Sequence, residues 1–125
     1  MTREEEQYHI NSIINEINEI QAYISDMDQH QFEIEEETQQ VVGRSLKNIG
    51  EAASLLASSD DWADKYEEVD LMVLLRLQDS INNVTLEFAP GVIWTIVKED
   101  LPEIKRDLFE ITDNIDEEED IQGIL

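Results

Sequence analysis

The sequence predicts an all-α protein folded as an antiparallel four-helix bundle. Apolar residues recur every three or four positions in four separate stretches, which is the spacing of one buried helix face. Only two prolines and four glycines interrupt the chain, and no competing strand pattern is present. The 125 residues, 41% of them hydrophobic, suffice for one domain with one core. We expect the bundle in residues 1–115 and an acidic tail in residues 116–125.

The first helix is expected at about residues 4–25, because isoleucine marks one of its faces. The stripe consists of Ile10, Ile13, Ile14, Ile17, Ile20 and Ile24. Residues 26–31 are polar and are expected to form a connector. The second helix should open with the acidic cluster of Glu33, Glu35, Glu36 and Glu37, since negative charge suits the positive end of the helix dipole. Its stripe is Val42, Leu46, Ile49, Ala53 and Leu56.

Ser58-Ser59-Asp60-Asp61 should end the second helix and supply capping side chains for the next segment. Trp62 is expected to pack back onto the core. A third helix is expected at residues 67–85, and its main stripe is Leu74, Leu77, Ile81 and Val84, continued by Phe88. Apolar residues also lie off this stripe, namely Leu71, Met72 and Leu75. A lone bundle would leave them partly exposed, so we expect a seam between two copies there.

The fourth helix should start at Pro90, because proline favours the first helical position and Ala89-Pro90-Gly91 interrupts the preceding pattern. Its stripe is Ile93, Val97, Leu101, Ile104, Leu108 and Ile111. Pro102 lies inside this run and predicts a kink or a brief break. Residues 116–120 are five consecutive acids, and we expect that end to be frayed.

The charge balance is strongly acidic: 8 Lys and Arg stand against 31 Asp and Glu, giving a formal net charge of −23. Such a chain should be repelled by nucleic acid, so no direct nucleic-acid binding is expected. Three interpretations remain open: a solvated surface that maintains solubility, an acidic surface that docks on a basic partner or imitates nucleic acid, and adaptation to salt. The carboxylates cluster in residues 4–6, 33–37 and 117–120.

The absence of cysteine excludes disulfides, thiolate metal sites and a cysteine nucleophile. The N-terminal stretch is acidic where a secretory signal would be basic, and no apolar run reaches membrane-spanning length, so a cytoplasmic protein without membrane contact is expected. Glu6 and His9 have the spacing of a di-iron Glu-x-x-His pair, but Met27 occupies the matching position before His30. We therefore expect no metal and no cofactor, with both histidines exposed to solvent.

Two stretches resemble the HepT-like branch of the HEPN family. Arg44-Ser-Leu-Lys-Asn-Ile-Gly-Glu-Ala-Ala53 is similar to its R-x-L-x-x-I-G-E-A signature. Around Trp94, an apolar pair precedes the tryptophan and Asp100-Leu101-Pro102 follows it, as in that family's final helix. From the residues alone, Gly50, Ala52 and Ala53 favour close approach of a neighbouring helix. Arg44 and Glu51 lie on roughly one face, and Trp94 is typical of a core or interface aromatic.

The resemblance implies a ribonuclease motif, in which an Arg binds phosphate, a His moves a proton, and a Tyr follows two residues later. Counting back from Trp94 places the Arg position at Gln78 and the following polar position at Asp79. The His position is Asn83 and the Tyr position is Thr85. None of the four matches the motif. Arg76 lies two residues before the Arg position and could be a displaced remnant.

These observations leave three functions from different classes. The leading hypothesis is a non-catalytic HepT-like module that acts by protein–protein contact, related to the RNase toxins of toxin–antitoxin systems. The resemblance implies a homodimer through the third and fourth helices and a nucleotidyltransferase antitoxin as partner. The alternative is an acidic inhibitor or nucleic-acid mimic of a basic protein, such as a nuclease or defence effector. The third is an RNase with an unrecognised site.

Overall fold

A computed structural model describes residues 2–58 and 90–124, with side chains of the second range described as far as Thr112. All regular secondary structure in these two ranges is helical, which confirms the all-α fold class. The expected third helix at residues 67–85, and Trp62 before it, lie outside the described residues.

Helix α1 (Arg3–Tyr23) carries the expected isoleucine stripe, and every member of that stripe is buried. Thr2 caps its N-terminus, because the Thr2 hydroxyl oxygen accepts a hydrogen bond of 3.1 Å from the Glu5 backbone N–H. The stripe ends with Ile24, which is the C-cap residue.

A short helix, α2 (Gln29–Ile34), occupies part of the expected connector, so the prediction of a continuous connector over residues 26–31 was wrong. Its start is a capping box between Asp28 and Gln31. The Asp28 carboxylate accepts from the Gln31 backbone N–H at 2.8 Å, and the Gln31 side-chain oxygen accepts from the Asp28 backbone N–H at 3.1 Å. One buried side chain, Phe32, anchors this helix.

Helix α3 (Glu36–Ala57) begins after a single residue, Glu35, that separates it from α2. The expected stripe from Val42 to Leu56 is entirely buried. Glu36 and Glu37 stand in the first turn, as the dipole argument predicts. Glu33, in contrast, belongs to α2 and not to the start of this helix, which corrects the sequence-based boundary.

The C-terminal run consists of α6 (Pro90–Thr95), a π-helical turn η1 (Ile96–Asp100) and α7 (Leu101–Ile124). Pro90 is the first helical residue, as expected. The Leu101 backbone N–H donates to the Ile96 carbonyl five residues back, which widens the helix just before Pro102. Proline lacks an N–H and its ring clashes with the carbonyl four residues earlier, so the predicted break takes the form of a π turn.

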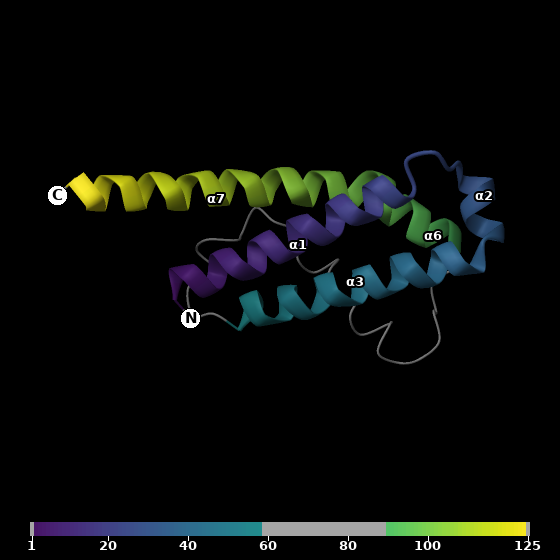
Figure 1. Ribbon diagram of the computed structural model, residues 1–125, viewed down its shortest axis with the longest axis horizontal. Coiled ribbons are helices and arrows are strands. Elements are labelled where there is room, and N and C mark those ends of the chain that lie inside the picture. Colours follow the sequence, from purple (N-terminus) through teal and green to yellow (C-terminus); the bar gives the residue numbers. More distant parts are fainter. Residues whose placement is uncertain (1, 59–89, 125) are drawn as a thin grey trace.

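The α7 backbone is helical as far as Ile124, so residues 116–124 continue the fourth helix, and the expectation that this end frays stays a prediction. Glutamate is a good helix former, and residues 116–120 contain neither glycine nor proline. In Figure 1, α7 runs past the N-terminal end of α1, so its C-terminal part projects beyond the other described helices.

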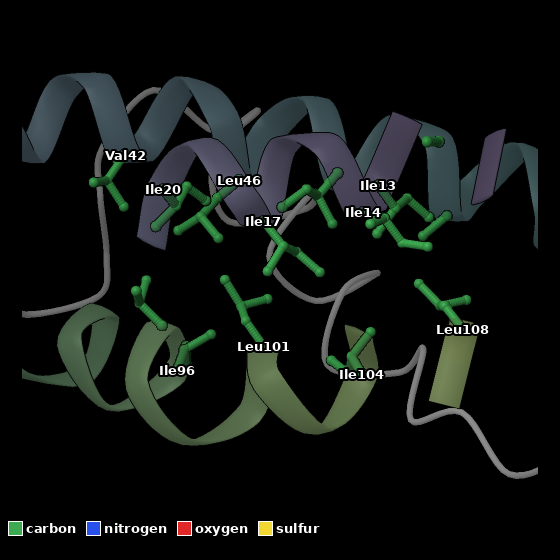
Figure 2. Close-up of a cluster of buried hydrophobic side chains, with 14 of the residues drawn as sticks. Ile13, Ile14, Ile17, Ile20, Val42, Leu46, Ile96, Leu101, Ile104 and Leu108 are labelled. Carbon is green, nitrogen blue, oxygen red and sulfur yellow. The ribbon is translucent and has the colours of Figure 1, made fainter. Parts of the chain in front are cut away.

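The described core lies on both sides of α1, which packs against α3 and against α7 (Figure 1). Helix α1 runs antiparallel to both neighbours. Figure 2 shows Ile17 of α1, Leu46 of α3, and Leu101 and Ile104 of α7 pointing toward one another within this cluster. Among the described helices, none is long and apolar enough to cross a membrane.

Candidate functional site

The positions assigned to the ribonuclease motif, namely Gln78, Asp79, Asn83, Thr85 and the neighbouring Arg76, lie outside the described residues. The same is true of the seam residues Leu71, Met72 and Leu75. The described structure therefore bears on the other predicted residues, above all on the acidic cluster around the junction of α2 and α3.

Residues 33–37, which we call the acidic corner, comprise the end of α2, the linking residue Glu35 and the start of α3. Glu33, Glu35, Glu36 and Glu37 are all exposed, as a surface role requires. Between them lies Ile34, whose side chain is 66% exposed. The charge pattern alone did not identify this exposed apolar side chain, which has four glutamates as close neighbours in the sequence.

Gln39 holds the acidic corner in place from the first turn of α3. Its side-chain amide donates to the Phe32 carbonyl at 2.8 Å and to the Glu33 carbonyl at 3.0 Å. These carbonyls belong to the last turn of α2, where helix carbonyls lack partners within the helix. The buried Thr38 adds a hydrogen bond from its hydroxyl to the Glu35 carboxylate at 2.9 Å. These hydrogen bonds connect the first turn of α3 to the end of α2 and restrain the turn between them.

Beneath the corner, α2 is anchored on α6 by an aromatic contact. The rings of Phe32 and Trp94 lie 5.5 Å apart between centroids, and the Lys98 ammonium lies 4.9 Å from the centroid of the Trp94 ring. Trp94 packs against the core, as expected of an aromatic on an apolar stripe. A Cβ added at Gly91 would lie 2.9 Å from a carboxylate oxygen of Glu33, which is the end of an exposed side chain that can move aside.

The N-terminal acidic cluster is only partly a surface feature. Glu4 and Glu5 are exposed, but Glu6 is 1% exposed, which corrects its assignment to an acidic surface. Glu6 precedes Ile10 by four residues and Ile13 by seven, so it lies on the buried face of α1. The periodicity could have identified this position. Residues 117–120 lie within α7, and their side chains are outside the described part.

The two histidines have different surroundings. His30 is exposed, as expected. His9 is half-buried instead of exposed, with its ring 5.5 Å from the Tyr8 ring in an edge-on arrangement. Within the described ranges, no three His, Asp or Glu side chains form a group that could hold a metal ion.

Helix α3 carries the stretch that resembles the family signature. Arg44 and Glu51 are exposed, whereas Gly50, Ala52 and Ala53 are buried. The two alanines belong to the core, so the small residues of the stretch are used in packing. The two charged residues are available to solvent or to a partner.

A family model described as "Ribonuclease HepT-like" matches residues 13–111, which is most of the chain and runs from within α1 to within α7. This chain belongs to the HepT-like ribonuclease family. The match confirms the resemblance read from the α3 stretch and from the residues around Trp94.

Three relatives of this HepT-like chain come from the archaeon Methanocaldococcus jannaschii. One, named "Putative RNase", is 30% identical over 108 residues, which cover 86% of this chain and 88% of the relative. A second with that name is 24% identical and is covered over 97% of its length. The third, named a gamma-glutamylcyclotransferase and putative RNase, is 25% identical over 114 residues. The chain spans 50% of that larger relative. No solved structure matches significantly.

Sequence reasoning missed two residues of this HepT-like chain that define the acidic corner. In the sequence, Ile34 looks like one more apolar residue of an amphipathic helix. Its exposure follows from the end of α2 at Glu35, and the composition does not predict that end. Gln39 lies in a Gln-Gln pair, and only the fold distinguishes it from exposed Gln40. The Asp28 and Gln31 spacing was the available signal for α2.

Proposed function

We propose that this chain is a non-catalytic HepT-like protein that acts by binding another protein. One assignment supports the non-catalytic part: the interval counted back from Trp94 puts Gln78 and Asn83 at the positions where the family motif has Arg and His. Glutamine has no positive charge to bind phosphate, and asparagine does not titrate, so neither can replace the motif residue. Asp79 adds a negative charge where RNA would bind.

The acidic corner supports the binding part of this proposal. Interfaces gain most of their affinity from a few apolar anchors inside a polar rim, and exposed Ile34 among carboxylates has that arrangement. The hydrogen bonds from Gln39 and Thr38 hold the turn before any partner arrives. A preformed surface loses less conformational entropy on binding than a loose one.

The proposed partner is a basic protein with an apolar pocket for Ile34. Within the family resemblance, a cytoplasmic nucleotidyltransferase antitoxin is the first protein to test, although Thr85 stands where the modified Tyr would be. Contact through the acidic corner would not need that Tyr.

A second candidate function is inhibition of a basic protein by imitation of nucleic acid. The exposed carboxylates of the acidic corner, together with Glu4 and Glu5, favour it. The two functions differ in one respect that competition can measure. Double-stranded DNA should displace a nucleic-acid mimic from its target, whereas an interface anchored by Ile34 should be much less sensitive to it.

The non-catalytic part is tested by incubating the purified protein with single-stranded RNA at stoichiometric concentration, without metal. We expect no cleavage. Cleavage that disappears on Arg76→Ala would overturn this part and support an RNase with an unrecognised site. Cleavage that survives Arg76→Ala would need repetition with protein from an independent preparation, to exclude a contaminating nuclease.

The binding part is tested by affinity capture from the native host, followed by binding kinetics with the captured partner. Replacing Glu35, Glu36 and Glu37 by Gln should slow association, because charged rims act mainly on the association rate. A matched control replaces the exposed Glu51, Glu99 and Glu103 by Gln, which changes the net charge equally. Ile34→Ala should speed dissociation. Equal effects of the corner triple and the control triple would contradict a contact at the acidic corner.

A further inference from the structure

An open groove lies between α1 and α7, and it is unusual for this acidic molecule because two cations line it. Its volume is about 390 Å³, and its lining residues are Gln21, Pro102, Lys105, Arg106, Phe109 and Glu110. The helices that form it differ from those of the acidic corner, which belongs to α2 and α3. We call it the α1–α7 groove.

The spacing of residues along α7 explains why these side chains gather at one edge of its contact with α1. Leu101 and Ile104 point toward α1 in Figure 2, and Leu108 continues the same buried stripe. Each core residue is followed by a residue of the groove, rotated by about 100° around the helix. The pairs are Leu101 and Pro102, Ile104 and Lys105, and Leu108 and Phe109. The groove residues therefore lie beside the buried contact.

The groove offers an exposed aromatic ring next to an exposed cation. Phe109 is 45% exposed, and Arg106 precedes it by three residues, which makes the two side chains neighbours on the helix surface. In the described ranges, no ion pair occupies the Arg106 guanidinium. The Lys105 ammonium donates to the Gln21 side-chain oxygen at 3.2 Å, which ties the lysine to α1. Such a groove suits a ligand that carries both an anionic and an apolar group.

The charges around the groove limit how much negative charge its ligand can carry. Glu110 lines the groove, and the exposed Glu103 precedes Arg106 by three residues. The whole chain has a net charge of −23. A nucleic-acid strand carries a phosphate at every nucleotide, so most of its charge would be repelled. A peptide can place one or two carboxylates at the cations and keep its other residues uncharged, so charge complementarity favours a peptide.

We propose that the α1–α7 groove binds a peptide segment of another protein in which one or two carboxylates stand next to a large apolar side chain. A carboxylate of the peptide pairs with the Arg106 guanidinium, whose parallel N–H groups match its two oxygens. The apolar side chain packs on the ring of Phe109 and removes that ring from water. This inference goes beyond the proposed function, in which a basic protein binds the acidic corner.

The test selects peptides from a phage-displayed library of random dodecapeptides on the full wild-type chain and measures the affinity of each selected peptide by fluorescence anisotropy. Some selected peptides should bind Arg106→Gln/Phe109→Ala at least about tenfold more weakly, as expected when a charge pair and its apolar neighbour are removed. We expect these peptides to carry Asp or Glu within two positions of a large apolar residue.

The matched control is Arg44→Gln/Leu55→Ala on α3. It removes the same charge and a side chain of similar exposure, because Arg44 is exposed and Leu55 is 49% exposed. The control variant should bind the groove-dependent peptides as tightly as the wild-type chain does. Both substituted pairs lie at the surface, and circular dichroism confirms that the variants are folded.

A double-mutant cycle tests the charge contact itself. Arg106→Gln alone should weaken a groove-dependent peptide, and replacing the acidic residue of that peptide by its amide should weaken it too. The two changes together should cost little more than either one, because both remove the same ion pair. Fully additive effects would overturn the contact between Arg106 and the peptide carboxylate.

Three further results would overturn the proposal. In the first, no selected peptide distinguishes the groove variant from the α3 control. In the second, the peptides that do distinguish them are basic or contain no carboxylate. In the third, a labelled single-stranded RNA dodecamer binds the wild-type chain, loses affinity for the groove variant and displaces the peptides, so that the groove is a nucleic-acid site. None of these results bears on the acidic corner, which is tested with its own variants.

Discussion

Gln39 shows how much one side chain can contribute to an exposed turn. Its amide group donates to two consecutive carbonyls at the end of α2, so a single residue of α3 closes the preceding helix. A lost hydrogen bond matters most when the remaining partner has no substitute, and helix-end carbonyls have no second partner in their own helix. We therefore expect Gln39, together with the hydrogen bond from Thr38 to Glu35, to stabilise the conformation of the acidic corner.

Gln39→Ala should lower the free energy of unfolding by about 1–2 kcal/mol, because two hydrogen bonds of about 1 kcal/mol each are lost. Chemical denaturation followed by circular dichroism measures this change. Gln40→Ala is the control, since Gln40 is the exposed neighbour in the same turn. If both variants lose the same stability, helix propensity and not the two carbonyls would be the cause.

Phe32→Ala should be far more destabilising, by about 3–5 kcal/mol, because Phe32 is 1% exposed and anchors α2 on Trp94. Ile34→Ala, two residues away in the same helix, should change stability by no more than about 0.5 kcal/mol, because Ile34 is 66% exposed. Denaturant titration of both proteins compares them directly. A large loss in the Ile34 variant would mean that this side chain is buried in solution and is not available as an anchor.

At the level of elements, the π turn η1 lies between two buried stretches of the C-terminal run. The apolar residues of each stretch have to face the core, so the rotation of the helix between the two stretches matters. Ile93, Ile96 and Val97 are buried before or within it, and Leu101, Ile104 and Leu108 are buried after it. A π turn is equivalent to an α-helix with one additional residue. The wider turn accommodates the ring of Pro102, and the buried residues before and after it still pack against the core.

Deleting Glu99, an exposed residue of η1, should convert the π turn to an α-helical turn and restore the clash at Pro102. The deletion combined with Pro102→Ala should be more stable than the deletion alone, by about 1–3 kcal/mol. Deleting exposed Glu103 instead should be much more disruptive, because it rotates Ile104 and Leu108 away from the core. Thermal unfolding of the three proteins ranks them. Equal loss from the two deletions would contradict the description of η1 as one inserted residue.

The elements that could be predicted from the sequence are those with long stripes. The isoleucine stripe of α1 and the stripe of α3 are buried in full because at least five residues of each repeat at helical spacing. Helix α2 was missed because six residues with one buried side chain give no period to detect. Pro102 predicted a break in the helix. The type of break depends on how the residues before and after Pro102 pack against the core. The buried Glu6 was misassigned because its charge was given more weight than its spacing.

The residues of the candidate site likewise fall into those that could be predicted from the sequence and those that could not. The carboxylates of the acidic corner were predicted because charge is visible in a sequence, and all four are exposed. Ile34 could not be predicted, because its exposure results from a turn that only the contacts of Gln39 and Thr38 define. Gln78 and Asn83 were assigned by interval alone and lie outside the described residues, so that assignment stays a prediction.

At the level of the whole molecule, a net charge of −23 on 125 residues implies repulsion that the folded state has to overcome. Added sodium chloride should therefore raise the midpoint of thermal unfolding in dilute protein. Most of the rise should occur as the Debye length falls from about 30 Å at 0.01 M to about 8 Å at 0.15 M. The triple replacement of Glu51, Glu99 and Glu103 by Gln should show a smaller rise. A midpoint indifferent to salt would indicate that the carboxylates are too dispersed to repel one another in the native state.

The π turn also has a consequence for aligning this chain with its relatives. An inserted residue at η1 requires a one-position gap in any relative that lacks it, so intervals counted from Asp100-Leu101-Pro102 shift by one, while those counted from Trp94 do not. A shift of one residue in either direction moves the Arg position to Leu77 or Asp79, and the His position to Asn82 or Val84. None of these is an Arg or a His. The predicted loss of the Arg and His positions is therefore the same whether or not the alignment shifts by one residue.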